Sequence, residues 1–377
     1  MNDIIIIGGG ISGLSAARHL QQNNIAFKLI TEDIGGRIHT SKDGSIQYGA
    51  YYVMDIYNHT KKFIKLGRKI KPAELIFHKR GHGYSLLQKS TIKYIPQIIK
   101  YVLILHKFKK HYGRFKKNCC TTSQAENIRN DSYLLNLYNT NALKFVKDCG
   151  IDGFVKQYAE EVLHGTTFTK IEKLNAFTFL QFSLPLITPI YEFVLDKNKI
   201  TENFRDDIII DSVESIKKEN DLYSIKTKKG TYLAKDVIVA IPPNISQKLL
   251  GLKNIKAPAS AHMFHIVGKV QEKWHKGYCN LFSDENEMLA IAFMPDQSCL
   301  FYSKNPNPDF EKYFHNFQIL ESKFWNPAFN IEGNVLWDSK IAENLYLIGD
   351  HNICGIEDSF ITGIYAANQI IKKIIQI

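Results

Sequence analysis

The chain has 377 residues, of which 45% are hydrophobic, and it carries a formal net charge of +11. This length and apolar content predict a globular protein of two domains. No apolar run reaches the roughly eighteen residues of a membrane span, and the six cysteines lack a disulfide-rich spacing. The first predicted strand begins at residue 3, so we expect no signal or transit peptide and a cytoplasmic protein with reduced thiols.

The first residues of the chain have the pattern of a nucleotide-binding unit. An apolar run over 3–7 is typical of a strand buried on both faces. It leads directly into the sequence G-x-G-x-x-G at 8–13. Apolar residues at helical spacing follow over 14–22, and 26–30 is predicted to be a second strand. This order of strand, glycine turn, helix and strand predicts a Rossmann-like unit.

Each glycine of this turn has a physical reason to be there. Gly8 is expected to make the tight turn, Gly10 to let the backbone approach a pyrophosphate, and Gly13 to let helix and strand pack closely. The helix N-terminus then directs unpaired N–H groups at the phosphates. Glu32 lies about twenty residues further on, where a carboxylate can accept hydrogen bonds from a ribose.

Later segments favour FAD over NAD. Gly35-Gly36-Arg37 follows the second strand almost at once, and 43–53 is predicted to be a glycine-punctuated hairpin. Near the C-terminus, the apolar strand 345–348 ends in Gly349-Asp350 and precedes an amphipathic helix over 356–375. A late strand that ends in Gly-Asp before a helix suits the ribityl and flavin half of FAD, because the helix N-terminus stabilises negative charge on the ring.

These segments resemble the flavin-containing amine oxidases, with their protoporphyrinogen oxidase and phytoene desaturase relatives. The matching segments are 4–13, 35–40, 44–53, 206–243 and 344–374. The resemblance implies a discontinuous Rossmann-like α/β domain that binds FAD, with an inserted α+β substrate domain that contains a helical subdomain. It also implies an FAD-dependent oxidoreductase acting on a small-molecule substrate.

The resemblance assigns the FAD contacts to residues from both ends of the chain. These are Gly8, Gly10, Ile11, Ser12 and Gly13 at the pyrophosphate, Gly36 and Arg37 beside it, Gly49, Ala50, Tyr51 and Tyr52 behind the flavin, Val213 at the adenine, and Gly349, Asp350 and Ile356 at the ribityl chain and the flavin. At the ribose, Thr31 occupies the family's usual glutamate position and Glu32 follows it, so the contact is assigned to either residue.

The chain also departs from the pattern of the amine oxidases. Phe264 stands ten residues before Trp274, where many members have a lysine near the flavin N5. His351 takes the place of the second tyrosine of the family's aromatic cage, and Phe329 or Asn330 lies near the place of the first. No cysteine stands where some members tether FAD, so we expect the cofactor to be bound non-covalently.

The residues expected around the reacting face of the flavin are aromatic. We predict that Tyr52, Trp325 and His351, with Tyr51, orient a flat or cationic substrate, and His351 is also a candidate proton donor or base. Ordinary core packing is the alternative for the tyrosines, and a structural hydrogen bond is the alternative for His351. No metal-binding spacing occurs in the sequence, so no metal is expected.

The positive charge is concentrated in one region. Residues 61–118 hold seventeen lysines and arginines against a single acid, Glu74. Within them, 92–117 interleaves aliphatic and basic residues. One interpretation is a helix with an apolar stripe in the core and a solvated basic face. The other is a helix that lies on an anionic membrane surface. No nucleic-acid partner is expected, because no reading motif accompanies the charge.

The motifs predict how the chain is divided. We expect the FAD-binding domain to comprise 1–58, 200–250 and 335–377, and the substrate domain to comprise 59–199 and 251–334. Such a discontinuous arrangement would place the reactive ring in a pocket between the domains.

Within the predicted substrate domain, 59–195 is expected to be mostly helical. The segments 260–269 and 288–302 are expected to be strands, with a helix over 310–323.

Three functions remain open from the sequence. The first is an oxidase of amines or amino acids that passes a hydride from a substrate C–H to the flavin N5, with O₂ as the expected acceptor. The second is a desaturase, dehydrogenase or isomerase for a lipophilic polyene or ring, favoured by the missing lysine and the basic-apolar segment. The third is a flavin-binding protein without turnover, against which the intact glycine motifs argue.

Overall fold

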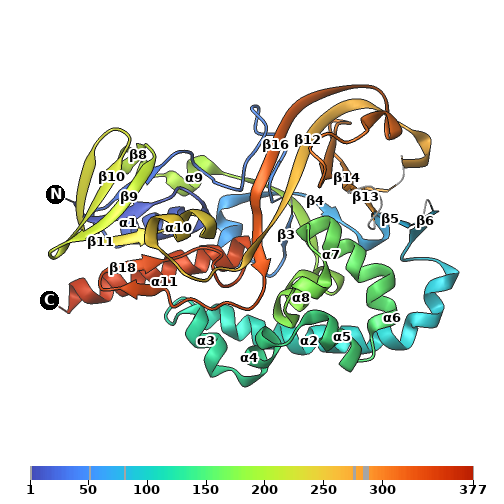
Figure 1. Ribbon diagram of the computed structural model, residues 1–377, viewed down its shortest axis with the longest axis horizontal. Helices are drawn as coiled ribbons and strands as arrows, with labels where there is room; N and C mark the ends of the chain where they lie inside the picture. The colour runs from blue at the N-terminus through green and yellow to red at the C-terminus, as the bar shows by residue number, and fades with distance from the viewer. Residues whose placement is uncertain (1, 51, 80–81, 275–276, 283–287, 377) are drawn as a thin grey trace.

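The computed structural model describes residues 2–50, 52–79, 82–274, 277–282 and 288–376. Its first sheet collects strands from distant parts of the chain and lies at the end of the molecule that holds both termini (Figure 1). In sheet order these are β17 (Lys340–Ala342), β18 (Leu345–Leu347), β11 (Thr231–Val239), β1 (Asn2–Ile7), β2 (Lys28–Thr31) and β8 (Ile208–Ile210), with β10 (Leu222–Thr227) paired to β11 and β9 (Val213–Glu219) paired to β10.

The centre of this sheet explains the apolar run at the start of the chain. Ile6 of β1 lies opposite Leu29 of β2 and Ile238 of β11, and both pairings are parallel. A strand with parallel neighbours on both sides buries both of its faces, which requires continuous apolar residues. The predicted strand–turn–helix–strand unit and the α/β fold class are therefore confirmed.

Two helices cover this sheet and pack against each other, α1 (Ile11–Gln22) and α11 (Ile356–Ile375). A Cβ placed on Gly363 of α11 would lie 2.3 Å from the carbonyl oxygen of Ser12 in α1. Only glycine permits so close an approach of two backbones. The N-terminal and C-terminal segments of the chain are thus in direct contact.

The other sheets lie at the opposite end of the molecule and above its middle (Figure 1). The larger one has the order β16 (Phe314–Glu332), β12 (Ala257–Val270), β15 (Cys299–Ser303), β14 (Met288–Phe293), β13 (Cys279–Phe282), β5 (Leu75–Lys79) and β6 (His82–Ser85). The smaller one has the order β3 (Val53–Met54), β7 (Ile190–Leu195) and β4 (Ile64–Ile70).

The remaining helices lie mostly along the lower side of the molecule in Figure 1. They are α2 (Ile95–Asn118), α3 (Gln124–Asn130), α4 (Ser132–Asn139), α5 (Ala142–Asp148), α6 (Asp152–Phe154), α7 (Glu160–Thr167) and α8 (Ala176–Ser183), with α9 (Lys197–Thr201) and α10 (Pro243–Leu250) near the first sheet. The rings of Phe108 in α2 and Phe177 in α8 meet edge to face with centroids 5.3 Å apart. Such aromatic pairs form the core between α2 and the rest of the helical region.

The predicted helix over 310–323 is wrong. This segment holds a short 3₁₀ turn at Phe310–Lys312 and then enters β16, which pairs antiparallel with β12. Phe314 and Phe317 follow helical spacing, yet both rings pack onto the sheet. Register shifts along the β12–β16 pair disturb the two-residue alternation of a strand, which is why the sequence pattern resembled a helix.

Two further predictions need correction. Helices dominate only 95–183 of the predicted helical part 59–195, because β4, β5 and β6 precede them and β7 follows them. The predicted hairpin over 43–53 is not built from two paired strands among the described residues. An isolated bridge joins Gln47 to Thr40, which lies before this segment, and Val53 begins β3, which pairs with β7. The domain boundaries stay a prediction.

A buried carboxylate fastens the start of α11 to the chain segment that follows the first FAD-binding motifs. Glu357 accepts hydrogen bonds from the backbone N–H groups of Asn58 at 2.8 Å, His59 at 2.9 Å and Thr60 at 3.0 Å. Its side chain is about 1% exposed. Burial alone would raise the pKa of Glu357, but the hydrogen bonds from His59 and Thr60 lower this pKa to about 2.

We therefore predict that Glu357→Gln lowers the free energy of unfolding by at least about 2 kcal/mol, because charge-assisted hydrogen bonds are lost. The folded-state pKa of Glu357 is depressed, so its contribution is complete above the usual pKa of 4.5 and is lost as the pH falls towards 2. Urea unfolding across this pH range measures both effects, with Glu219→Gln on the exposed end of β9 as the control. Equal unfolding curves for wild type and Glu357→Gln would contradict this prediction.

Candidate functional site

A cavity of about 490 Å³ lies where the first sheet, the start of α11 and strand β16 meet. Its lining differs between two parts. One part is lined by the glycine turn after β1 and by the end of β2, and the other by aromatic residues of β16, β15 and the helical region. Every predicted cofactor-binding residue among those the structure describes lines this cavity except Gly13. Tyr51 lies outside the described residues.

The glycine turn leaves open space in front of α1. Gly8 has a φ of +108°, and a Cβ there would lie 2.5 Å from the carbonyl oxygen of Ala240. A Cβ on Gly13 would lie 1.9 Å from the carbonyl oxygen of Gly8. At Gly10, by contrast, a Cβ would meet no described atom within 4 Å. Two of the glycines therefore permit close packing, whereas Gly10 leaves room for another molecule.

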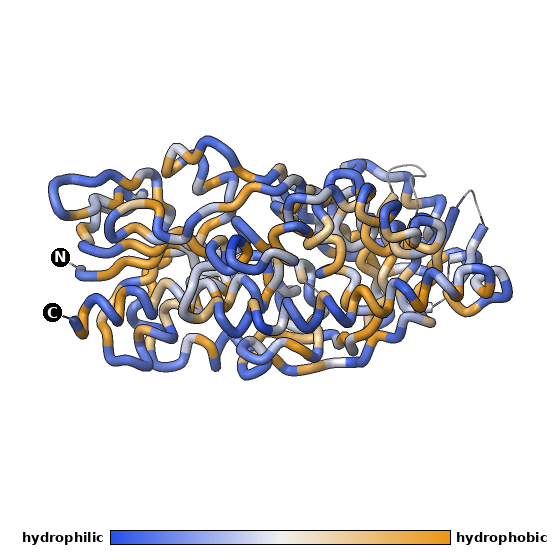
Figure 2. Tube along the Cα trace, turned by 90° about the horizontal axis from the view of Figure 1, so that it is seen from below, coloured by the Kyte–Doolittle hydropathy of each residue, from blue (hydrophilic) through white to orange (hydrophobic). Residues whose placement is uncertain are grey.

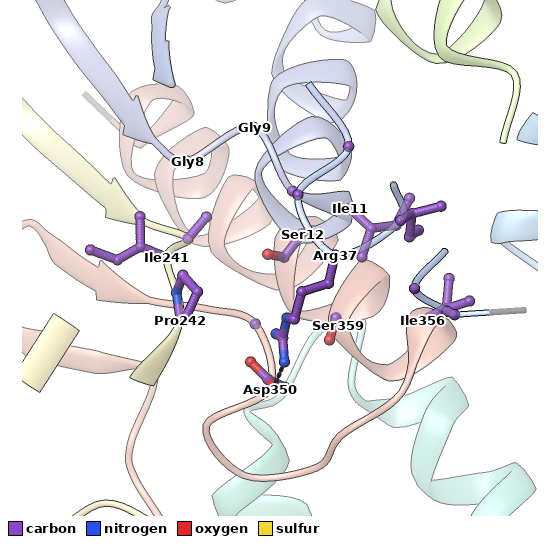
Figure 3. Close-up of a pocket in the computed structure, with 18 of the residues that line it drawn as sticks. Gly8, Gly9, Ile11, Ser12, Arg37, Ile241, Pro242, Asp350, Ile356 and Ser359 are labelled. Atoms are coloured by element: carbon purple, nitrogen blue, oxygen red, sulfur yellow. Dashed lines mark hydrogen bonds and ion pairs between the residues drawn. The ribbon is translucent and has the colours of Figure 1, made fainter. Parts of the chain in front are cut away.

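Two helix N-termini face this space. Gly10 is the N-cap of α1 and Gly355 is the N-cap of α11, and neither helix has a side-chain cap among the described residues. Figure 3 shows Ser12 at the start of α1 and Ser359 and Ile356 at the start of α11 around the same cavity. Helix N-termini carry partial positive charge and unpaired N–H groups, so this arrangement favours an anionic or electron-rich ligand.

An ion pair lies between the two helix ends (Figure 3). Arg37 Nη1 donates to Asp350 Oδ2 at 2.7 Å and to the carbonyl oxygen of Ala328 at 3.1 Å. The carboxylate side chain of Asp350 is only about 3% exposed. Burial alone would raise the pKa of Asp350, but the charge and the hydrogen bond of Arg37 outweigh burial and hold this pKa below its usual range. The cavity therefore contains a fixed carboxylate that can accept a hydroxyl hydrogen bond.

The geometry favours Glu32 over Thr31 as the ribose contact. Thr31 Oγ1 accepts from the backbone N–H of Gly9 at 2.8 Å and donates to the carbonyl oxygen of Asp33 at 2.7 Å. Its hydroxyl is thus committed to the glycine turn. Glu32 lines the cavity and accepts a hydrogen bond from Ser212, the neighbour of Val213.

Aromatic rings line the other part of the cavity. Phe168 packs against Tyr302 and Phe329 with ring centroids 5.5 and 5.8 Å apart, and Phe182 meets Phe329 edge to face at 5.8 Å. Tyr52 and Trp325 also line this part, as predicted for the aromatic wall. Burial raises the pKa of Tyr52 to about 12, so its hydroxyl stays neutral.

Phe329 and Asn330 were the two candidates for the first position of the aromatic cage, and successive side chains of β16 point to opposite faces of the strand. Phe329 faces the cavity, whereas the adjacent Asn330 is fully buried outside the lining.

His351 does not reach the cavity, contrary to our prediction. It is absent from the lining residues described, and its Nε2 lies 2.8 Å from Ser246 Oγ of α10. Burial lowers the pKa of His351 to about 4, so its ring is neutral. The chain turns after Asp350, which directs the next side chain away from the cavity and into the packing against α10. The structural role that the sequence left open for His351 is the one that this geometry fits.

Several residues that line the cavity carry no motif that would have pointed to them, or lie in one whose role was not recognised. They include Phe168, Phe182, Ile241, Pro242, Tyr302, Lys323, Cys354 and Ser359. The sequence A-I-P-P at 240–243 was a usable signal, because it follows β11 directly. Phe168 and Phe182 come from a region without a motif, and only tertiary packing identifies them.

Phe264, at the position of the missing lysine, and Trp274 do not line the cavity. Phe264 lies in β12 and Trp274 in a short 3₁₀ turn after it, and both belong to a separate core cluster of the larger sheet. Among the described residues, no group of three His, Cys, Asp or Glu side chains could hold a metal ion.

Comparisons with known proteins agree with this geometry. Residues 6–65 match the family described as an NAD(P)-binding Rossmann-like domain. In sequence, the chain is 34% identical over 92 residues to flavin-containing amine oxidase B of Bos taurus, a match that covers 22% of this chain and only 18% of that enzyme.

Solved structures match over nearly the whole chain. A CLA-producing fatty acid isomerase from P. acnes has a TM-score of 0.72 at 13% identity, with 98% of each chain covered. A double mutant of putrescine oxidase has a TM-score of 0.69 at 11% identity, with 98% of this chain and 99% of that chain covered. These matches show that the chain shares the fold of both structures over nearly its whole length, and the Rossmann-like N-terminus agrees with that fold.

Proposed function

We propose that the cavity binds FAD non-covalently, with the dinucleotide extended between the two helix N-termini. The observation that carries this proposal is the open space at Gly10, which lies directly before α1 and beside Gly36. In this arrangement Arg37 and the N-terminus of α1 hold the pyrophosphate, and Asp350 accepts from a ribityl hydroxyl. Glu32 accepts from the ribose, and the backbone of Val213 meets the adenine.

The aromatic part of the cavity is then the place of the reaction. When bound, FAD supplies a hydride acceptor at N5, and this is the chemistry that the protein directs. The N-terminus of α11 at Ile356 stabilises negative charge at the carbonyl edge of the ring. Tyr52, Trp325 and Phe329 hold the substrate flat and exclude water from the C–H bond that is broken. We propose amines or amino acids as substrates and O₂ as the electron acceptor.

A second candidate is a desaturase or a redox-neutral isomerase for a lipophilic substrate. Its support is the composition of the cavity wall. The lining carboxylates of the described residues are Glu32, Asp33, Asp211 and Asp350, and none of them belongs to the aromatic part. An ammonium group would therefore meet ring faces without a counter-ion, whereas an apolar chain would be buried well. The similarity in fold to a fatty acid isomerase is consistent with this candidate.

The placement of the pyrophosphate predicts that Gly10→Val lowers the FAD content to below about a tenth of wild type, because the added side chain overfills the space. Gly10 has a φ of −72° and a ψ of 177°, which valine adopts readily, so the fold should persist. Flavin released by heat, relative to protein, measures the effect. Gly113→Val on the exposed face of α2 is the control, since a Cβ there also meets no described atom within 4 Å. Wild-type flavin content in Gly10→Val would refute the placement.

Non-covalent binding predicts that acid precipitation releases all of the flavin into the supernatant. Cys354 is the one thiol among the described lining residues, and burial raises its pKa well above the usual range. A protonated thiol is a poor nucleophile, so no bond to the cofactor is expected. Flavin that stays in the protein pellet would contradict this prediction, and Cys354→Ala would then identify the attachment.

The proposed reaction predicts that an amine or amino acid bleaches the flavin absorbance without O₂, and that admitting O₂ restores it with release of one hydrogen peroxide per turnover. The flavin-poor Gly10→Val protein is the control and should release none. Unsaturated fatty acids are tested in parallel. A shifted double bond without peroxide would favour the isomerase, and a spectrum that no compound changes would favour a binding protein without turnover.

A further inference from the structure

Helix α2 presents two apolar faces, of which only one belongs to the core. Tyr101, Leu105, Phe108 and Tyr112 are at most 1% exposed and pack inward. A second set of aliphatic residues, which we call the aliphatic stripe, points outward. It comprises Leu87, Ile92, Ile95, Ile99 and Leu103, with exposed fractions of 76, 64, 47, 57 and 64%.

The residues of the aliphatic stripe within α2 lie on one side of this helix. Ile95, Ile99 and Leu103 are separated by four residues each, so they lie above one another along the first half of α2. Ile92 continues the same line one turn earlier, and Leu87 lies in the segment just before it. Single exposed aliphatic residues are ordinary, but five along one edge form a surface that water solvates poorly.

Basic residues surround the aliphatic stripe. Lys89, Lys93, Lys100, Lys107 and Lys110 are all exposed. The sequence contains no aspartate or glutamate between Glu74 and Glu126 that could offset them. Figure 2 views the molecule from the side on which α2 lies in Figure 1 and shows hydrophobic and hydrophilic positions interleaved along the helices of this face.

We propose that this face of α2 binds the surface of an anionic lipid bilayer. The aliphatic stripe enters the boundary between head groups and acyl chains, and the flanking lysines contact anionic head groups. The charge selects this occupant over a second copy of the chain, because a two-fold contact would place the lysines of both copies against each other. No described helix is long and apolar enough to cross a membrane.

Vesicle co-sedimentation tests this proposal and does not depend on bound FAD or on activity. Wild-type protein should sediment with vesicles of phosphatidylcholine and phosphatidylserine, much less with phosphatidylcholine alone, and should be released by high salt. Ile99→Ser with Leu103→Ser should reduce the partition coefficient at least about ten-fold, since two aliphatic side chains that would enter the bilayer are lost. Ile319→Ser with Leu320→Ser on β16 is the matched control, because these residues are 40 and 48% exposed but lie far along the chain from α2.

The charges are tested separately. Lys93→Gln with Lys100→Gln should weaken binding by about five-fold for each lysine. The control, Lys217→Gln on β9 with Lys228→Gln in the turn between β10 and β11, should not weaken it. Failure of the wild type to sediment with anionic vesicles would overturn the proposal, and so would equal binding to neutral vesicles. Light scattering tests the alternative of a second copy. If the wild type does not bind vesicles but forms a dimer, and the Ile99→Ser, Leu103→Ser variant is a monomer, the face belongs to a contact between two copies.

Discussion

The close contact of α1 with the strand beneath it and with α11 beside it brings the two ends of the chain to one cavity. Gly13 lets α1 approach the turn at Gly8, and Gly363 lets α11 approach Ser12. In both places a Cβ would lie within 2.3 Å of a backbone oxygen, so larger residues would push the elements apart. With α1 held on both sides, its N-terminus and that of α11 face the same space. The proposed FAD site depends on this arrangement.

Buried carboxylates then secure the start of α11. Asp350 pairs with Arg37 at 2.7 Å, and Glu357 accepts from the backbone of 58–60. Asp358 accepts from the hydroxyl of Tyr112 in α2 at 2.6 Å and from Gln181 in α8 at 3.3 Å. Negative charge near a helix N-terminus is favourable, and here each carboxylate also joins a different part of the chain. The helical region is thereby connected to the wall of the cavity.

The proposal of a lipophilic substrate and the proposal of a lipid-binding face both rest on apolar surface that is not accompanied by acidic side chains. Phe168, Phe182 and Phe329 line the part of the cavity where a substrate would lie, and the aliphatic stripe lies on the outside of α2. An apolar substrate drawn from a bilayer would suit both features. A small amine would use the aromatic faces alone and would have no need of the stripe.

The Rossmann-like unit could be predicted from the residues alone, because a strand buried on both faces and a glycine turn impose local demands that few residues satisfy. The positions of Gly8, Gly10, Arg37 and Asp350 at one cavity could be predicted for the same reason: each lies in a short motif next to the strand or helix that positions it.

Features that depend on neighbours far away in the chain could not be predicted in this way and required the folded structure. The segment 310–323 has a helical pattern of apolar residues, yet most of it forms part of β16 because it pairs with β12. His351 packs against α10, where its ring contacts Ser246. The folded structure also divides the apolar residues of α2 between the core and the surface. Periodicity reports which residues share a face, but the partner that covers that face comes from elsewhere in the chain.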